Sequence, residues 1–263
     1  MLKQRLLTAL VSLLILGAVL FFVPSFVARF LIASLFVVGA WEWGGFLGSG
    51  GRSYRLAYAV FIGALIAGLN VNLSGAGLLD SVFKVSLAWW LIALGWLPFF
   101  PTGIPALVAW ICGAVVLVPA WAALDHLYSQ SPALLVFGLL IVWVADIGAY
   151  FVGKGFGRVK LAPAISPGKT WEGVLGGLGA VLLLAAVGSR VLAVDIAVLV
   201  PLCLAVAMLS IVGDLTVSMF KRTAGIKDSG SLLPGHGGVL DRIDSVTAAA
   251  PLFVLALSWI GLQ

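Results

Sequence analysis

Nine long apolar stretches constrain this chain more than any other feature of its sequence. They lie roughly at 6–23, 26–46, 55–73, 82–100, 103–122, 132–153, 171–188, 193–217 and 246–262. A helix needs about 20 mostly apolar residues to cross a bilayer. With 62% apolar residues and a mean hydropathy of +1.20, the chain is too hydrophobic for a soluble domain. We therefore predict an all-α, polytopic integral membrane bundle of about nine transmembrane helices.

The distribution of Lys and Arg predicts the orientation, because cationic loops stay on the cytoplasmic side. With a cytoplasmic N-terminus, 12 of the 15 Lys and Arg lie inside and only Arg29, Lys84 and Arg190 lie outside. An even number of helices would place the two large cationic loops on opposite faces, so this asymmetry also supports the count of nine. The net charge of +5 is then first a topology signal and second a hint of an anionic partner. We expect no nucleic-acid partner.

The chain is predicted to form one membrane domain, 1–263, with N-terminal spans in 1–130 and a catalytic half in 131–263. The first apolar stretch resembles a signal peptide, but no small-x-small cleavage site precedes Pro24, so we interpret it as a helix. Cys112 and Cys203 lie inside predicted spans, where a disulfide or a soft-metal site is not expected. Two inward loops, 154–170 and 218–245, remain as candidates for function.

The longer inward loop concentrates charge in an otherwise apolar chain. Residues 218–244 hold four Lys or Arg, three Asp and one His, whereas charged residues make up only 10% of the whole chain. The run 235–238 is too rich in glycine to stay helical, and it can offer several backbone N–H groups to an anion. Such dense charge between two apolar spans predicts the location of the chemistry.

A carboxylate inside the sixth span marks a second candidate. An ionisable group at the depth of Asp146 is costly and usually functional, although a structural hydrogen bond to a neighbouring helix is the alternative. Helical spacing places Asp146, Ala149, Tyr150 and Gly153 on one face, which predicts a small-residue seam toward the cytoplasmic mouth. The following loop, 154–170, mixes glycines with cations and so suits a phosphate-bearing ligand, but the positive-inside rule alone also explains its cations.

Carboxylates recur near the ends of the last two spans. Asp214 precedes Ser218 by one turn, and Asp241 and Asp244 share one face where the ninth span should begin. Two carboxylates at a helix N-terminus can simply complement its dipole. With Asp228 in the same loop, however, they form a set of hard oxygen ligands without Cys or clustered His, which suits Mg²⁺. Together with the cations and glycines, this set predicts phosphoryl or nucleotidyl transfer to a lipid at the inner membrane surface.

The segment from Ser218 to Asp244 can be written as a pattern of about fourteen defined residues at fixed spacing. The pattern is Ser-x2-Lys-Arg-x4-Lys-Asp-x-Gly-x2-Leu-Pro-x-His-Gly-Gly-x2-Asp-Arg-x-Asp. This pattern resembles the signature of the phosphatidate cytidylyltransferases, also called CDP-diacylglycerol synthases, and a pattern this long is far more specific than a lone glycine triplet. The upstream patterns Asp146-x2-Ala-Tyr-x2-Gly and Ser166-Pro-Gly-Lys-Thr-Trp-Glu-Gly also resemble that family. The N-terminal hundred residues carry little of the resemblance beyond hydropathy and the pair Trp41-Glu42.

The resemblance implies that CTP and phosphatidate react to give CDP-diacylglycerol and pyrophosphate, a step of bacterial phospholipid synthesis. It also implies Mg²⁺, a second and monovalent cation such as K⁺, a homodimer, and a multi-pass protein of the bacterial inner membrane whose active site faces the cytoplasm. A phosphomonoester has a second pKa of about 6, so the attacking lipid phosphate is already mostly a dianion at neutral pH. In-line attack on the α-phosphorus of CTP therefore needs no strong general base.

Matching positions to the family pattern assigns roles to individual residues. The predicted metal ligands are Asp214, Asp241 and Asp244, with Asp146 as a further ligand or support. The predicted phosphate-binding cations are Lys221, Arg222, Lys227 and Arg242, which share the catalytic loop with Asp228. Contacts to the nucleotide are expected from Ser166, Lys169 and Glu172, and other substrate contacts from Tyr150, Ser218, Gly237 and Gly238.

Two residues carry weaker predictions. His236 is a candidate catalytic residue that could donate to a phosphate, stack on cytosine or cap its turn, and direct catalysis is the less favoured of these because no base is needed. Glu42 lies between Trp41 and Trp43 near the inner surface. It could contact the substrate, but we interpret the three residues as an interfacial aromatic anchor with a helix-end carboxylate.

Two other functions stay open. A CTP-dependent polyprenol or phytol kinase would use a hydroxyl acceptor and would need a base, and we expect such enzymes to lack the complete signature. A CDP-alcohol phosphotransferase is disfavoured because its Asp-Gly-x2-Ala-Arg opening is not found in the sequence. An anion transporter would also carry intramembrane carboxylates, but here the charges gather on one face of the membrane and no inverted repeat is visible.

Overall fold

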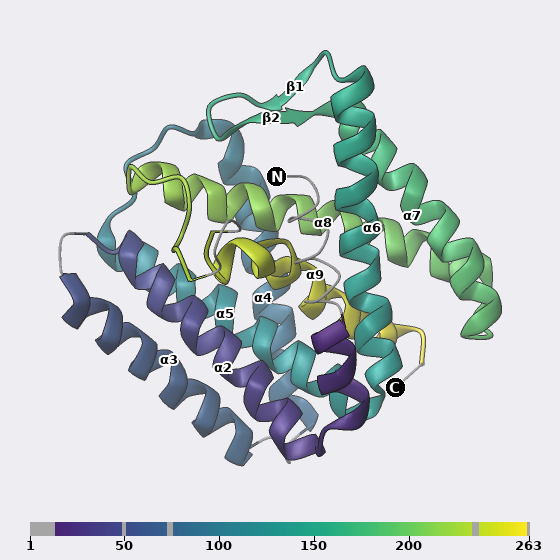
Figure 1. Ribbon diagram of the computed structural model, residues 1–263, viewed down its shortest axis with the longest axis horizontal. Coiled ribbons are helices and arrows are strands. Elements are labelled where there is room, and N and C mark those ends of the chain that lie inside the picture. The colour runs from purple at the N-terminus through teal and green to yellow at the C-terminus, as the bar shows by residue number, and fades with distance from the viewer. Residues whose placement is uncertain (1–13, 49–50, 73–75, 233–236, 262–263) are drawn as a thin grey trace.

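The protein is a bundle of long helices with a small β-hairpin at one end (Figure 1). The computed structural model describes residues 14–48, 51–72, 76–232 and 237–261. Its long helices are α2 (Ser25–Trp43), α3 (Gly51–Asn72), α4 (Ala76–Trp96), α5 (Ala106–Gln130), α6 (Pro132–Phe156), α7 (Trp171–Val191), α8 (Ile196–Thr223) and α9 (Leu240–Trp259). Residues 14–22 are also helical, and short 3-10 helices, η1 and η2, follow α2 and α4 at Gly44–Phe46 and Leu97–Phe99.

The predicted all-α membrane bundle is confirmed. Each predicted span coincides with a helical segment, although residues 6–13 of the first span lie outside the described residues. Within the described part of the chain, seven helices, α2 to α8, are long and apolar enough to cross a membrane. The last two helices extend beyond their predicted spans, α8 to Thr223 and α9 back to Leu240, so Asp241 and Asp244 lie on α9 and only Asp228 of the signature carboxylates lies in the loop.

Helix α9 forms the centre of the bundle. It packs against α8, α5, α4, α6 and α2. Small side chains allow this close packing, because Ala248, Ala249 and Ala250 are all buried. The outer helices instead present apolar side chains to the surroundings, for example Val60 on α3 and Leu183 on α7, which are 63% and 72% exposed. Apolar residues turned outward are what a lipid environment favours.

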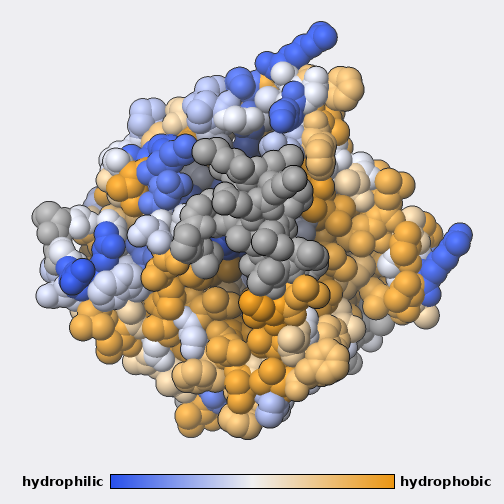
Figure 2. Space-filling model, viewed as in Figure 1, coloured by the Kyte–Doolittle hydropathy of each residue, from blue (hydrophilic) through white to orange (hydrophobic). Residues whose placement is uncertain are grey.

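The expected inward loop 154–170 contains regular structure that the sequence analysis did not predict. It folds into an antiparallel hairpin of β1 (Lys160–Ala162) and β2 (Ser166–Thr170). Ile165 in the turn is buried and anchors the hairpin. Thr170 ends β2 and caps α7, because its side-chain oxygen accepts a hydrogen bond from the Gly173 N–H at 3.2 Å. Hydrophilic residues gather around this hairpin, whereas hydrophobic residues cover much of the lower part of the same face (Figure 2).

Glycines bring α6 and α7 unusually close. A Cβ atom on Gly177 would lie 2.6 Å from the Ala145 carbonyl oxygen, and one on Gly148 would lie 2.8 Å from the Gly176 carbonyl oxygen. Backbones that approach this closely gain van der Waals contact, which drives helix association where there is no water to exclude. This contact holds the wall of the cavity described below.

A partly buried ion pair joins α2 and α5 at the end of the bundle away from the hairpin. Asp125 is 3% exposed, and the Arg29 guanidinium donates to its two oxygens from Nε at 2.7 Å and from Nη2 at 2.6 Å. Arg29 also donates to Asn70 on α3 at 3.3 Å. A bidentate pair of this kind fixes the mutual position of its helices as well as their charge.

We expect Asp125→Asn to lower the free energy of unfolding by about 1–3 kcal/mol, because it leaves Arg29 without its charged partner in a partly buried site. Thermal unfolding in detergent measures the change. The matched control is Asp80→Asn, which breaks the exposed i, i+4 ion pair with Lys84 and should cost less than about 0.5 kcal/mol. Equal effects of the two substitutions would contradict the role assigned to the partly buried pair.

Candidate active site

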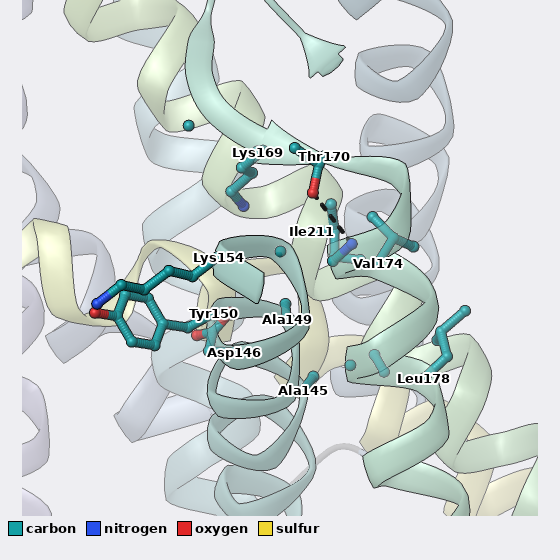
Figure 3. A pocket seen from close by; sticks show the side chains of 15 residues that line it. Ala145, Asp146, Ala149, Tyr150, Lys154, Lys169, Thr170, Val174, Leu178 and Ile211 are labelled. Atoms are coloured by element: carbon teal, nitrogen blue, oxygen red, sulfur yellow. Dashed lines mark hydrogen bonds between the residues drawn. The ribbon is translucent and has the colours of Figure 1, made fainter. Parts of the chain in front are cut away.

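A cavity of about 490 Å³ opens between α6, α7, α8 and β2. Most of its wall consists of small or apolar side chains, and its polar lining comes from Asp146, Tyr150, Lys154, Lys169 and Thr170. In Figure 3, Asp146 and Tyr150 lie on α6 with Lys154 one turn further along, and Lys169 lies on the strand above them. The predicted seam is confirmed, because the cavity is lined by Asp146, Ala149, Tyr150 and Gly153.

Lys169 connects this cavity to α8. Its ammonium group forms an ion pair with the carboxylate of Asp214, and both side chains are only partly exposed. Ser218, one turn further along α8, donates from Oγ to Asp214 Oδ1 at 3.2 Å, as their spacing predicted. The structure therefore brings a residue of the expected nucleotide site into contact with an expected metal ligand.

Lys221 lies buried between the two carboxylates of α9. Its Nζ is 2.8 Å from Asp241 Oδ1 and 3.8 Å from Asp244 Oδ2, and the residue is only 7% exposed. An ammonium group buried to this extent must be paired. In the described structure Lys221 therefore neutralises carboxylates, and its predicted contact with phosphate stays a prediction.

Asp241 is fully engaged in hydrogen bonds. Oδ1 faces Lys221, and Oδ2 accepts from the Ser229 N–H at 3.0 Å and from the Gly238 N–H at 2.9 Å. Burial alone would raise the pKa of Asp241, but Lys221 and the backbone donors outweigh it and hold that pKa below its ordinary value of 3.8. Asp241 thus ties two segments of the loop together, while its predicted role as a metal ligand stays a prediction.

Asp244 has a different environment on the next turn of α9. It is 7% exposed, and its Oδ1 accepts only from the adjacent Ser245 N–H, at 2.9 Å, among the hydrogen bonds of the described residues. Burial raises the pKa of Asp244, the nearby Asp214 carboxylate raises it further, and Lys221 lowers it. A cation bound beside Asp244 and Asp214 would offset this repulsion.

Arg222 and Glu172 hold the hairpin in place. Arg222 donates from Nε to the Ile165 carbonyl oxygen at 3.1 Å and from Nη1 to the Ile226 carbonyl oxygen at 3.4 Å. Glu172 accepts from the Val159 N–H, which lies 3.1 and 3.2 Å from its two oxygens. Both residues were expected to contact substrate, and their observed contacts are with the protein backbone.

The remaining predicted residues lie around this cluster. Ser166 on β2 is half-buried, whereas the exposed members are Lys227, Asp228 and Arg242. Gly237 has a φ of +82°, a conformation that favours glycine, and Gly238 donates to Asp241 as described. His236 lies outside the described residues.

Glu42 is the important residue whose position the sequence interpretation got wrong. It is 1% exposed and Trp43 is fully buried, so the two do not form an interfacial anchor. Glu42 accepts hydrogen bonds from Ser229 Oγ at 2.9 Å, from the Val239 N–H at 3.0 Å and from the Leu240 N–H at 2.7 Å. An ionisable residue inside a predicted span is a functional candidate by default, and that signal could have identified it.

Comparison with known proteins identifies the family of the chain. The model of the cytidylyltransferase family matches residues 3–260. The chain belongs to this family. It is 45% identical to the phosphatidate cytidylyltransferase of Pseudomonas aeruginosa over 98% of this chain and 97% of that protein. It is 37% identical to the phosphatidate cytidylyltransferase of Haemophilus influenzae, over 96% of this chain and 97% of that protein.

A member of the cytidylyltransferase family must neutralise the negative charge of nucleotide phosphates. The carboxylates of this site are ligands of the kind that a magnesium ion prefers. Among the described residues, no three His, Cys, Asp or Glu side chains converge into a complete metal site. Mg²⁺ does not require one, because it commonly uses one or two carboxylates and completes its shell with water and substrate phosphates. Asp214 and Asp244 offer such a pair of hard oxygen ligands.

The contact that aligns this pair is the crossing of α8 and α9 at Gly213. A Cβ atom there would lie 2.7 Å from the Asp244 carbonyl oxygen and 2.9 Å from the Ala248 side chain. We expect Gly213→Ala to push the helices apart and to lower the free energy of unfolding by about 1–3 kcal/mol, measured by thermal unfolding. Gly179→Ala on α7 is the control, because its Cβ would meet nothing within 4 Å; if the control were equally destabilised, the crossing would not be the cause.

Proposed function

We propose that this protein transfers CMP from CTP to phosphatidate, giving CDP-diacylglycerol and pyrophosphate in phospholipid synthesis. The observation that carries the proposal is the similarity to the Pseudomonas aeruginosa phosphatidate cytidylyltransferase over nearly the whole of both chains. The arrangement of the site supports it independently, because Asp146, Lys154 and Lys169 line a largely apolar cavity and Lys169 links that cavity to Asp214. A substrate with a phosphate head and apolar tails matches both the charged residues and the apolar lining of the cavity.

The residues of the site suit an in-line displacement at the α-phosphorus of CTP. Lys169 borders the cavity and reaches Asp214, so it can exchange this carboxylate for an incoming phosphate oxygen. Lys221 keeps Asp241 ionised and reduces the repulsion around Asp244. A magnesium ion held by Asp214 and Asp244 would neutralise charge on phosphate oxygens. The lipid phosphate is already mostly a dianion at neutral pH, so no side chain has to remove a proton from it.

The same proposal includes the setting of the enzyme. The apolar helices and the bacterial relatives support a multi-pass membrane protein, and we propose the bacterial inner membrane with the active site facing the cytoplasm. The distribution of Lys and Arg supports this orientation. A homodimer and a second, monovalent cation such as K⁺ near Asp146 belong to the proposal as well, and both rest on the family resemblance.

Purified protein in detergent, given CTP, phosphatidate and Mg²⁺, is expected to release pyrophosphate only when both substrates are present. Asp214→Asn and Asp244→Asn should each lower kcat at least about 100-fold, because each removes a charge that acts on the phosphates in the transition state. Asp195→Asn is the matched control, since Asp195 only caps the distant N-terminus of α8, and it should retain activity.

The controls separate the alternative functions. ATP and dCTP test the nucleotide, and a polyprenol tests the acceptor. CDP together with a phosphorylated alcohol would replace this proposal with a lipid kinase. Folded wild-type protein that turns over none of these pairs would refute the cytidylyltransferase activity and favour the transporter.

Lys169→Met is expected to lower kcat/KM for CTP by at least about tenfold, because the loss of one charge-assisted hydrogen bond to a phosphate weakens binding by roughly this factor. Lys160→Met on the neighbouring strand is the control. Lys160 is exposed on β1 and is not among the residues that line the cavity, so its loss should change kcat/KM less than about twofold. Steady-state pyrophosphate release measures both, and equal losses would show that Lys169 acts only through general surface charge.

A further inference from the structure

A buried glutamate from the N-terminal half of the chain caps the last helix. Glu42 on α2 accepts from the backbone N–H groups of Val239 and Leu240, at 3.0 and 2.7 Å. These residues form the N-terminus of α9, which has no side-chain cap of its own among the described residues. The N–H groups that begin a helix lack partners within it and carry the positive end of its dipole. A carboxylate is therefore the most favourable group to place there.

The carboxylate of Glu42 is closely enclosed by the protein. The carboxylate is 1% exposed and also accepts from Ser229 Oγ at 2.9 Å. A Cβ atom on either Gly230 or Gly238 would overlap this carboxylate. Both arms of the signature loop therefore pack directly against Glu42, and their glycines make the close approach possible.

A second carboxylate, Asp241, holds the same two arms of the loop as Glu42. We refer to the contacts of these two carboxylates with the loop and with the start of α9 as the clamp. Asp241 accepts from the Ser229 and Gly238 N–H groups, so the same two arms are held from the side of α9. Asp241 also receives Lys221 from α8. A continuous set of contacts thus runs from Glu42 through the start of α9 to Lys221, which in turn faces Asp244.

We propose that Glu42 is a positioning residue of the active site: by capping α9 it sets the height and rotation of Asp241 and Asp244 relative to Asp214 and Lys221 on α8. This inference rests on the proposed cytidylyl transfer for its catalytic consequence. Glu42 itself touches backbone and Ser229, and it acts on the reaction through the carboxylates that it places. A displacement of about 1 Å in such groups is enough to cost a large factor in rate.

Hydrogen–deuterium exchange of the full-length protein in detergent tests the clamp without any substrate. Glu42→Gln should speed exchange of the Val239 and Leu240 amides by at least about tenfold, because one acceptor oxygen becomes a donor that faces other donors. Asp125→Asn is the matched control. It weakens another buried carboxylate contact of the bundle and should leave these two amides unchanged.

Kinetics test the consequence for catalysis. Glu42→Gln should lower kcat by at least about tenfold while the KM for CTP changes less than about threefold, because the carboxylates are misplaced in the transition state more than in substrate binding. Ser229→Ala removes only one of the three donors and should give a smaller change in the same direction. It also keeps the test valid if Glu42→Gln does not fold.

Three outcomes would overturn the inference. They are unchanged exchange at residues 239–240 in folded Glu42→Gln, exchange that rises equally across all helices, and a loss of kcat matched by Asp125→Asn. The exchange measurement needs no turnover, so it decides the clamp even if the wild-type protein releases no pyrophosphate. Failure of the proposed function and failure of the clamp are therefore distinguishable.

Discussion

The need to pair every buried charge and backbone N–H group organises this protein. Most of its helices are surrounded by lipid or by apolar side chains, where an unpaired polar group is costly. The chain meets this need with few charged residues, which pair at both ends of the bundle: Arg29 with Asp125 at one end, and the signature residues at the end that carries the hairpin. Lys221 pairs with Asp241 and lies near Asp244, Lys169 pairs with Asp214, and Glu42 takes the free N–H groups of α9.

These pairings divide the carboxylates into two classes. Glu42 and Asp241 are saturated by hydrogen bonds from the backbone and from Ser229 or Lys221, so they hold the loop in place. Asp214 contacts Lys169 and Ser218, and Asp244 lies near Lys221 and accepts from the Ser245 N–H. In the proposed function these two carboxylates hold the magnesium ion. The saturated carboxylates hold the loop against α2 and α9, whereas Asp214 is linked through Lys169 to the cavity in which we propose that the substrates bind.

Much of this arrangement could be predicted because helical periodicity is a local property. The seam around Asp146 and the contact of Ser218 with Asp214 both follow from i, i+3 and i, i+4 spacing, and both are present in the structure. The hairpin at 160–170 was not predicted, because glycines and cations mask its short strands and the buried Ile165 gives only one apolar anchor. Arg222 and Glu172 were expected to contact substrate, since a cation or carboxylate in a signature looks alike whether it binds phosphate or a backbone group.

The sequence by itself determined the fold class and the family. Both depend on hydropathy and on the spacing of residues along the chain, and these can be read from the sequence without knowing any long-range contact. Only the tertiary structure decided which groups each carboxylate contacts. Asp241 and Asp244 are three residues apart on one helix and equivalent in sequence, yet one is saturated by Lys221, Ser229 and Gly238 while the other faces Asp214. The role of Glu42 was decided in the same way, because its partners lie almost 200 residues away and become neighbours only when α2 packs against α9.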